Sequence, residues 1–538
     1  MPSHSQPETP VGDTQPALLN PRPGIFWDAA VIAVLVCTAI VVLALPLFPS
    51  QDGPVHLYYA DIIRSLLTHS GVYAQHFEIK SFLTPYALEY YSLVVLETAF
   101  SPEMSEKLVV CCYIFAFGFG FKYLVESVAE RRSPWTLAGM PFCMNALVYL
   151  GSLNYSIGVA LTLFLCGFWI RCSGRLRSGR VTAVLACFLL TLFTHPVPVA
   201  IFLLFVGLHF AADLACAAKA GPGLWARSLQ ARWRPLTMIA LMAGTAAVWV
   251  GMFVNHSGHF RNQPSSVGEH GWIRAVSSLL KLWPVAPFTS PAYRGGLLFL
   301  LAMTGLFLFV GAWIHKDRIS PAAIAIIATG AICFTLFCIA PGSINGSGFF
   351  PERFAIFWVL FLIAATAGFR PPRLCSLAAG VTALCVTIAV LALQWVNVSR
   401  IAPEVSSVMD TLPAKAGSVG LIIGEKSSLP EGLSFDPFFW GGVHYFRRSR
   451  AILANAPWLD VPLVMIRPAH PDRWSYLNPL PAGESLLGVL SAGEAVPDLS
   501  FVVREGRPGA MTDAVISGLG WSPLTPNGGS LGIYRPHP

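Results

Sequence analysis

Asp52 is the residue whose type and position best suit chemistry. It lies in the run Phe48-Pro-Ser-Gln-Asp-Gly-Pro-Val-His56, directly after the first long apolar stretch. A carboxylate at the outer mouth of a membrane helix can accept a proton from a hydroxyl nucleophile. His56, four residues on, lies on the same face if a helix starts here. Such a pair can hold a metal ion or shape a polar pocket, but two ligands do not define a metal site.

Asp52 also has a purely structural interpretation. An aspartate followed by Gly-Pro can cap a helix by placing its carboxylate on the free N–H groups of the first turn. The two roles are partly compatible, because a carboxylate at a helix start stays ionised, as a base must. The sequence leaves both open.

Arg353, in Pro351-Glu352-Arg353-Phe354, is the second candidate. It stands where a glycine-rich outer loop, 341–350, meets an apolar segment. An arginine at the outer interface can bind a phosphate group bidentately. The structural alternatives are an interfacial anchor or a local pairing of Glu352 with Arg353. Outer arginines run against the usual charge bias of membrane proteins, which favours substrate binding by Arg353 and Glu352.

Three further polar residues lie in other outer loops. His195 stands in the kink Thr194-His-Pro196, and Asn154 in the turn Gly151-Ser-Leu-Asn-Tyr155. Arg261 belongs to a long loop, 256–295, that also holds histidines and tryptophans. Each can contact a sugar or a phosphate, and each can equally be an ordinary polar group of a wet loop. They are predicted as substrate-binding residues.

Composition indicates a polytopic membrane protein. The 538 residues are 54% hydrophobic and only 12% charged, against about 25% charged in average soluble domains. The formal net charge of +7 requires no nucleic-acid partner, because the basic residues collect in short loops where they set topology. Eleven of the twelve cysteines fall in apolar segments, and none forms a CxxC motif. They are interpreted as small buried hydrophobes.

The apolar runs predict about eleven transmembrane helices. The connecting loops alternate in charge, and the basic ones, such as Arg171–Arg180 and Arg370–Arg373, belong in the cytoplasm. This places the N-terminus inside and the C-terminal region outside an inner (plasma) membrane. The predicted spans are 26–48, 103–127, 135–150, 156–170, 181–194, 198–217, 236–255, 296–314, 322–340, 354–369 and 374–396.

The first outer loop, 49–101, is expected to hold two interfacial helices. After Asp52, apolar residues recur at helical spacing, with charged residues on the other side. The segment 84–100 is apolar too, but it contains Glu89 and Glu97 and is too short to span. It is predicted to lie along the membrane surface, with Thr84 as its cap.

The two ends of the chain differ from this membrane domain, 26–396. Residues 1–25 are rich in Pro, Ser, Thr and Gln and are predicted to be a disordered cytoplasmic tail. Residues 397–538 contain short apolar runs separated by Pro and Gly, typical of a small α/β domain. The expected strands lie at 419–423, 463–466, 501–503 and 531–534, and 405–412 is a candidate helix.

The chain resembles the GT-C superfamily of integral-membrane glycosyltransferases, which use polyprenyl-phosphate-linked sugar donors. The resemblance covers most of 26–396: a first span, an acidic residue opening a long outer loop with two surface helices, many further spans and an extracytoplasmic C-terminal domain. It implies that Asp52 is the catalytic base or helps place a metal, and that Arg353 meets the donor phosphate. Many members carry a second acidic residue in the next outer loop, where this chain has only Asn154. The resemblance therefore implies no certain cofactor and leaves a divalent metal open.

The resulting hypothesis is inverting transfer of a sugar from a polyprenyl-phosphate donor to a hydroxyl of a glycan, lipid or protein acceptor. Two other classes remain open. A transporter or lipid flippase would need charged residues along a path within the spans, and the middles of these spans are almost free of charge. A non-catalytic assembly protein would use the C-terminal domain as a binding module.

Overall fold

The computed structural model describes most of the membrane domain and the central part of the C-terminal domain. The described residues are 23–175, 178–220, 232–256, 271–314, 319–341, 349–369, 373–406, 415–424, 433–434, 442–453, 466–468, 499–505, 521–523 and 531–536. Arg261 and the tail 1–22 lie outside these ranges.

Eight of the described helices are long and apolar enough to cross a membrane. The protein is therefore an integral membrane protein built mainly from helices. These eight are α1 (Pro23–Ala44), α4 (Pro102–Ala129), α7 (Leu153–Cys172), α9 (Pro196–Ala220), α11 (Trp233–His256), α13 (Pro291–Ile314), α14 (Pro321–Ile339) and α16 (Arg373–Ser406). α4 has a regular start: the Ser101 hydroxyl accepts a hydrogen bond from the Met104 N–H, and Pro102 occupies the first turn.

The predicted span at 135–150 is not one helix. It is divided into α5 (Trp135–Gly139), the 3₁₀ turn η2 (Met140–Phe142) and α6 (Ala146–Tyr149). Gly139 and Pro141 interrupt the helix, and the Asn145 side chain caps the next one by accepting from the Leu147 N–H at 2.9 Å. Two other predicted spans are short helices, α8 (Ser178–Leu192) and α15 (Glu352–Gly368).

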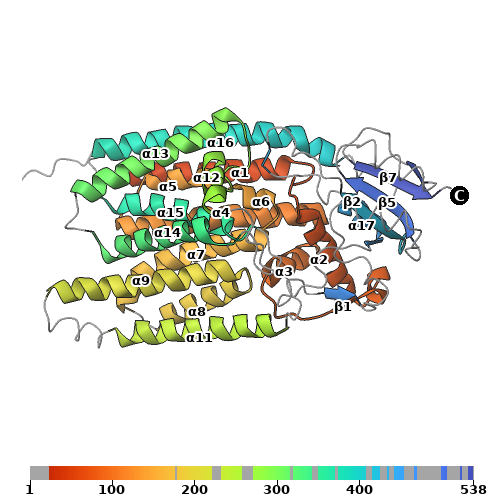
Figure 1. The fold of residues 1–538 in the computed structure, drawn as a ribbon, viewed down its shortest axis with the longest axis horizontal. Coiled ribbons are helices and arrows are strands. Elements are labelled where there is room, and N and C mark those ends of the chain that lie inside the picture. Colours follow the sequence, from red (N-terminus) through yellow and green to blue (C-terminus); the bar gives the residue numbers. More distant parts are fainter. Residues whose placement is uncertain are drawn as a thin grey trace, which may run out of the picture.

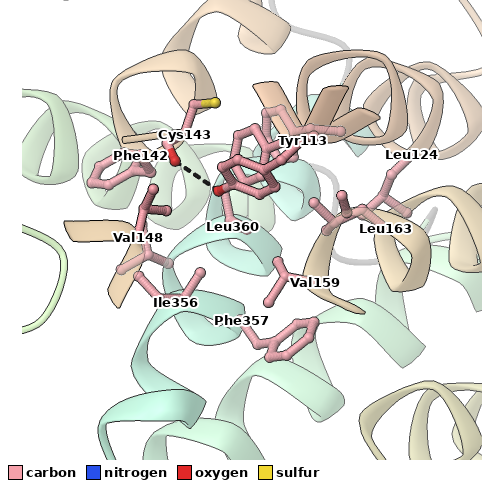
Figure 2. Packing of buried hydrophobic residues seen from close by; sticks show 14 of the residues in the cluster. Tyr113, Leu124, Phe142, Cys143, Val148, Val159, Leu163, Ile356, Phe357 and Leu360 are labelled. Carbon is pink, nitrogen blue, oxygen red and sulfur yellow. Dashed lines mark hydrogen bonds between the residues drawn. The ribbon is translucent and has the colours of Figure 1, made fainter. Parts of the chain in front are cut away.

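The core of the bundle lies around α4, α7 and α15. Figure 2 shows side chains from these helices and from the 142–148 segment interlocking, with Leu163, Val159 and Phe357 among them. The Tyr113 hydroxyl donates to the Cys143 carbonyl at 2.7 Å, so the one polar atom of this buried ring is satisfied. The interrupted segment is thus held against α4 by both packing and a hydrogen bond.

The loop 49–101 contains α2 (Gly53–Leu67), the 3₁₀ turn η1 (Val72–Gln75), the short strand β1 (Phe77–Ile79) and α3 (Ala87–Leu96). Its two helices are those expected from the sequence, and α3, with ten residues, is too short to span a bilayer. The predicted cap at Thr84 is wrong. Tyr86 precedes α3 in a left-handed conformation, and its N–H donates to the Thr194 carbonyl at 2.9 Å.

The C-terminal residues form a five-stranded sheet in the order β3-β2-β5-β7-β6. β2 (Val419–Gly424) pairs in parallel with β3 (Ile452–Leu453) and β5 (Leu499–Glu505), whereas β7 (Leu531–Pro536) pairs antiparallel with β5 and β6 (Trp521–Pro523). Three of the four expected strands therefore lie in β2, β5 and β7. Of the fourth, only Ile466 is described, at the start of β4 (Ile466–Pro468).

The sheet and the loop 49–101 lie together at one end of the helical bundle (Figure 1). β4 pairs antiparallel with β1, and α17 (Val443–Ser449) packs on α2. The Tyr58 hydroxyl accepts from the Leu453 N–H at 3.0 Å and donates to the Ala451 carbonyl at 3.2 Å.

Three basic residues lie together elsewhere in the bundle: Arg131, Arg132 and Arg171 line one hollow at the ends of α4 and α7.

Candidate functional site

Asp52 lies between α1 and α2, in the cap position of α2. Its backbone N–H donates to the Leu150 carbonyl at 3.2 Å, and the Gln51 N–H donates to the Tyr149 carbonyl at 2.8 Å. The carboxylate makes no capping hydrogen bond to α2, all of whose residues the structure describes. The purely capping interpretation of Asp52 is therefore wrong, and the side chain is available for another role.

The surroundings of Asp52 suit a base that works near neutral pH. The residue is partly exposed but densely surrounded by protein, and this burial raises the pKa of its carboxyl to about 7, although a hydrogen bond with the Gln51 side chain opposes the shift. Burial lowers the pKa of His56 to about 4, so this imidazole is neutral at pH 7. His56 Nδ1 lies 2.9 Å from the Tyr90 hydroxyl. Burial thus raises the pKa of Asp52 and lowers the pKa of His56.

Gly151 lets the turn before α7 approach Asp52 closely. Its φ of +83° suits glycine, and a Cβ added there would lie 2.9 Å from Asp52 Cβ and 2.8 Å from Gly53 N. Gly53 is equally confined, because a Cβ would lie 2.1 Å from a carboxylate oxygen of Glu106. These two glycines bring three chain segments together around Asp52.

Glu89 and Glu106 add two carboxylates to this neighbourhood. Glu106 accepts from the Ser50 hydroxyl at 2.7 Å. Glu89 is bound to Asn154, whose side-chain amide donates to Glu89 Oε2 at 2.7 Å. Burial, together with the nearby charges of Glu106 and Asp52, raises the pKa of Glu89 well above its usual value. Sequence analysis assigned no catalytic role to either glutamate. Asn154, predicted to bind substrate, contacts a carboxylate of the protein itself.

The described residues around Asp52 do not fit a resident metal ion. Among them, no group of three His, Cys, Asp or Glu side chains is arranged to hold one. Glu89 Oε2 is engaged by Asn154, and Glu106 Oε1 by Ser50. The described residues therefore supply no ligand set for the divalent metal that the resemblance left open.

Arg353 and His195 lie in a second, adjoining group. The Tyr155 hydroxyl donates to the Arg353 carbonyl, and the His195 ring lies edge-on between the rings of Tyr86 and Tyr155, with centroids 5.0 and 5.3 Å away. Burial and the positive charge of Arg353 lower the pKa of His195 well below its usual value. His195 is thus a neutral imidazole close to the arginine.

The tautomer of His195 follows from its hydrogen bond. Nδ1 accepts from the Val197 N–H at 3.1 Å, so the proton is assigned to Nε2. Nε2 is buried and has no hydrogen-bond partner among the described residues. An N–H donor of this kind beside an arginine can bind an anionic oxygen.

α7 joins the two groups. Asn154 faces Glu89, and the next residue, Tyr155, faces His195 and Arg353. Asp52, His56, Asn154, His195 and Arg353 therefore belong to one contiguous region at the end of the bundle that carries the loop 49–101.

Glu352 is held by an ion pair, and its predicted role in substrate binding stays a prediction. It forms an ion pair of 3.1 Å with Arg274 of α12 (Gly271–Lys281), and Arg274 also donates to the Phe337 and Ala340 carbonyls. Glu352 thus fastens the start of α15 to α12 and α14. Arg261, the remaining predicted residue, lies outside the described residues.

The described residues form a helical bundle with the loop 49–101 and a C-terminal sheet together at one end. The particular likeness is to ArnT from Cupriavidus metallidurans, a GT-C glycosyltransferase, in the crystal structure of its apo state. The TM-score is 0.50 at 11% sequence identity, covering 96% of this chain and 100% of that chain. At this identity the likeness shows the fold alone. No protein-family model matches the chain, and no curated protein sequence does.

Proposed function

We propose that the protein is a GT-C glycosyltransferase that moves a sugar from a polyprenyl-phosphate donor to an acceptor hydroxyl, with Asp52 as the base. The observation that carries the proposal is the Asp52 carboxylate, which is partly exposed, does not cap α2 and has a pKa of about 7. A general base works best with a pKa near the operating pH. The ArnT-like fold supports the same class of activity.

The proposed reaction is an inverting displacement at the anomeric carbon. The acceptor oxygen forms a bond to this carbon while the bond to the phosphate oxygen breaks, and Asp52 takes the proton of the acceptor hydroxyl. The polyprenyl phosphate leaves as an anion. Arg353 and the Nε2–H of His195 are assigned to this phosphate, because both are donors and they lie close together. Glu89 and Glu106 lie beside Asp52.

The proposal includes an orientation. The first outer loop and the C-terminal sheet share one end of the bundle, which we assign to the extracytoplasmic side of the inner membrane. Arg131, Arg132 and Arg171 would then face the cytoplasm, in agreement with the distribution of basic residues in membrane proteins. Donor and acceptor would meet at the outer surface.

Sugar transfer by the purified chain tests the proposal. The full-length protein in lipid nanodiscs is incubated with polyprenyl-phosphate sugars that carry a radiolabel in the sugar, together with an extract of envelope glycans and lipids. We expect label in a product that no longer contains the polyprenyl phosphate. A flippase would instead move the intact donor across a sealed vesicle without cleaving it, and that result would refute the proposed activity.

A further inference from the structure

The hollow between the ends of α4 and α7 lies far from Asp52. α4 begins directly after the loop 49–101, and its 28 residues extend about 42 Å, so its last residue lies at the opposite end of the bundle. The hollow has a volume of about 450 Å³. Its walls combine the apolar Ile170 with polar and charged side chains, namely Glu126, Ser127, Glu130, Arg131, Arg132 and Arg171.

The hollow lies where a membrane-spanning helix ends. α7 has 20 residues, which extend about 30 Å, the thickness of the hydrocarbon core of a bilayer. Arg171 is the second-last residue of α7 and therefore lies at the level of the lipid head groups. Arg131 follows the end of α4 by two residues and lines the same hollow. The side chains of both arginines are exposed.

Four charged residues at this end of the bundle neutralise one another. Asp28 pairs with Lys122 at 3.0 Å and with Arg132 at 2.9 Å. Lys122 also pairs with Glu126 at 2.6 Å. Two positive and two negative charges thus form one network, which contributes no net charge to the hollow.

Arg131 and Arg171 carry the remaining positive charge of the hollow. Neither forms an ion pair with a carboxylate in the part of the chain that the structure describes. Glu130 is the other charged residue of the walls, so two arginines against one glutamate leave a net charge of +1. This charge matches a phosphodiester, which carries one negative charge.

Two contacts fix the direction of the Arg171 side chain. Its Nε donates to the Ser127 hydroxyl at 2.8 Å, and its guanidinium carbon lies 4.2 Å from the centroid of the Tyr123 ring. The side chain nevertheless remains exposed. An arginine held in this way loses little conformational freedom when it binds the oxygens of a phosphate group.

An aromatic strip leads away from Arg171 along α7. Phe168 and Phe164 stand three and seven residues before Arg171, so the three residues share one face of the helix. The Phe164 ring stacks with that of Phe168 at 6.0 Å and with that of Tyr123 at 5.1 Å between centroids. Phe164 is 40% exposed. The strip offers an acyl chain an apolar surface directly below the arginine.

We propose that this hollow binds an anionic phospholipid of the leaflet at this end of the bundle. Arg131 and Arg171 bind the phosphodiester of the head group, and an acyl chain lies along Phe164 and Phe168. A lipid with a net negative charge is preferred to a zwitterionic lipid, whose own cation competes with the arginines. The inference does not rest on sugar transfer, because Asp52 and Arg353 do not line the hollow.

Native mass spectrometry of the detergent-solubilised full chain tests the proposal, because it resolves each lipid bound to the protein. The probes are palmitoyl-oleoyl phosphatidylglycerol, phosphatidylcholine with the same acyl chains, and glycerophosphoglycerol, the head group without its chains. The variants are Arg131→Gln, Arg171→Gln and Ser127→Ala. Arg400→Gln removes an exposed arginine of α16 and is the matched control.

We expect the first phosphatidylglycerol to bind at least about fivefold more tightly than phosphatidylcholine. Arg131→Gln and Arg171→Gln should each weaken its binding about fivefold, the scale of one basic residue beside an anionic lipid. Ser127→Ala should weaken it in the same direction, whereas Arg400→Gln should bind as the wild type does.

Equal affinity of the wild type for the two lipids would overturn the proposal. Phosphatidylglycerol binding that is unchanged in both arginine variants would do the same. The Arg131 variant keeps this test decisive if Arg171→Gln fails to fold, because Arg171 has contacts within the bundle. Binding of glycerophosphoglycerol as tight as that of the lipid would show a site for a soluble phosphodiester and would also contradict a lipid site.

Discussion

Glu89 and Asn154 hold each other by three hydrogen bonds across 65 positions of sequence. The Glu89 N–H donates to Asn154 Oδ1 at 3.0 Å, while Asn154 N and Nδ2 donate to Glu89 Oε2 at 3.2 and 2.7 Å. The pair joins α3 to α7 beside Asp52. It shows what Asn154 does in the fold: it binds the carboxylate of Glu89.

Asn154→Asp tests this relationship through the pH dependence of stability. The change sets a second carboxylate against Glu89 and should cost about 3 kcal/mol when both are ionised. Their repulsion raises the folded-state pKa of the pair above the unfolded value of about 4. The Asn154→Asp variant therefore keeps its stability below the unfolded-state pKa and loses stability as the pH rises through the folded-state pKa.

Melting temperatures of the wild type and Asn154→Asp should thus converge near about pH 4 and separate at neutral pH. Asn154→Ala is the matched control. It leaves Glu89 without its partner but adds no charge, so its deficit should not be rescued by acid to the same extent. A constant deficit for Asn154→Asp at all pH values would contradict the assigned contacts.

The activity should rise with pH through the pKa of Asp52. Only the ionised carboxylate can accept a proton, so turnover should fall about tenfold per pH unit well below pH 7. His56 has a pKa of about 4 and is neutral over this range. His56→Gln should therefore leave the midpoint of the profile in place. If His56→Gln shifts the midpoint of the profile, the titrating group is the His56 imidazole and not Asp52.

Arg353→Lys should weaken use of the donor more than it slows the chemical step. Lysine keeps the positive charge but loses the planar fork that binds two phosphate oxygens. We expect the KM for the polyprenyl-phosphate sugar to rise about tenfold, with a smaller change in kcat. Arg400→Lys, an exposed arginine of α16, is the control. Equal KM values for the two variants would show that Arg353 does not bind the donor.

Cysteine labelling tests the orientation. Lys415 and Ser178 are both exposed, one next to the C-terminal sheet and the other at the start of α8. In a background without the exposed native cysteines, a membrane-impermeant reagent added to intact cells should label Lys415→Cys and not Ser178→Cys. Native Cys172 is a poor reporter, because it is only 4% exposed. Labelling of Ser178→Cys would invert the proposed topology.

The sequence predicted the features that depend on local patterns. Apolar length identified the long helices, and amphipathic spacing after Asp52 identified α2. The short length and the glutamates of 84–100 correctly excluded a span. The prediction of a single span at 135–150 was wrong for a local reason. It followed the apolar composition and gave too little weight to Gly139 and Pro141, residues that interrupt a helix.

The contacts that build the site depend on tertiary structure. No spacing rule brings Glu89 to Asn154, or Glu352 to Arg274, because each pair joins separate helices. Polar residues in an otherwise apolar segment were the available signal for Glu106, which stands near the start of α4. The unpaired His195 Nε2 becomes visible only when the surrounding packing is known.

The central claim is that Asp52 is the base of a sugar transfer, and turnover by Asp52→Asn measures it most directly. Asparagine has nearly the same shape and cannot accept the proton. With a polyprenyl-phosphate sugar, turnover should fall ~100-fold or more while the melting temperature is kept, and Glu78→Gln, an exposed carboxylate of β1, should retain full turnover. Undiminished turnover by a stably folded Asp52→Asn protein would contradict the account.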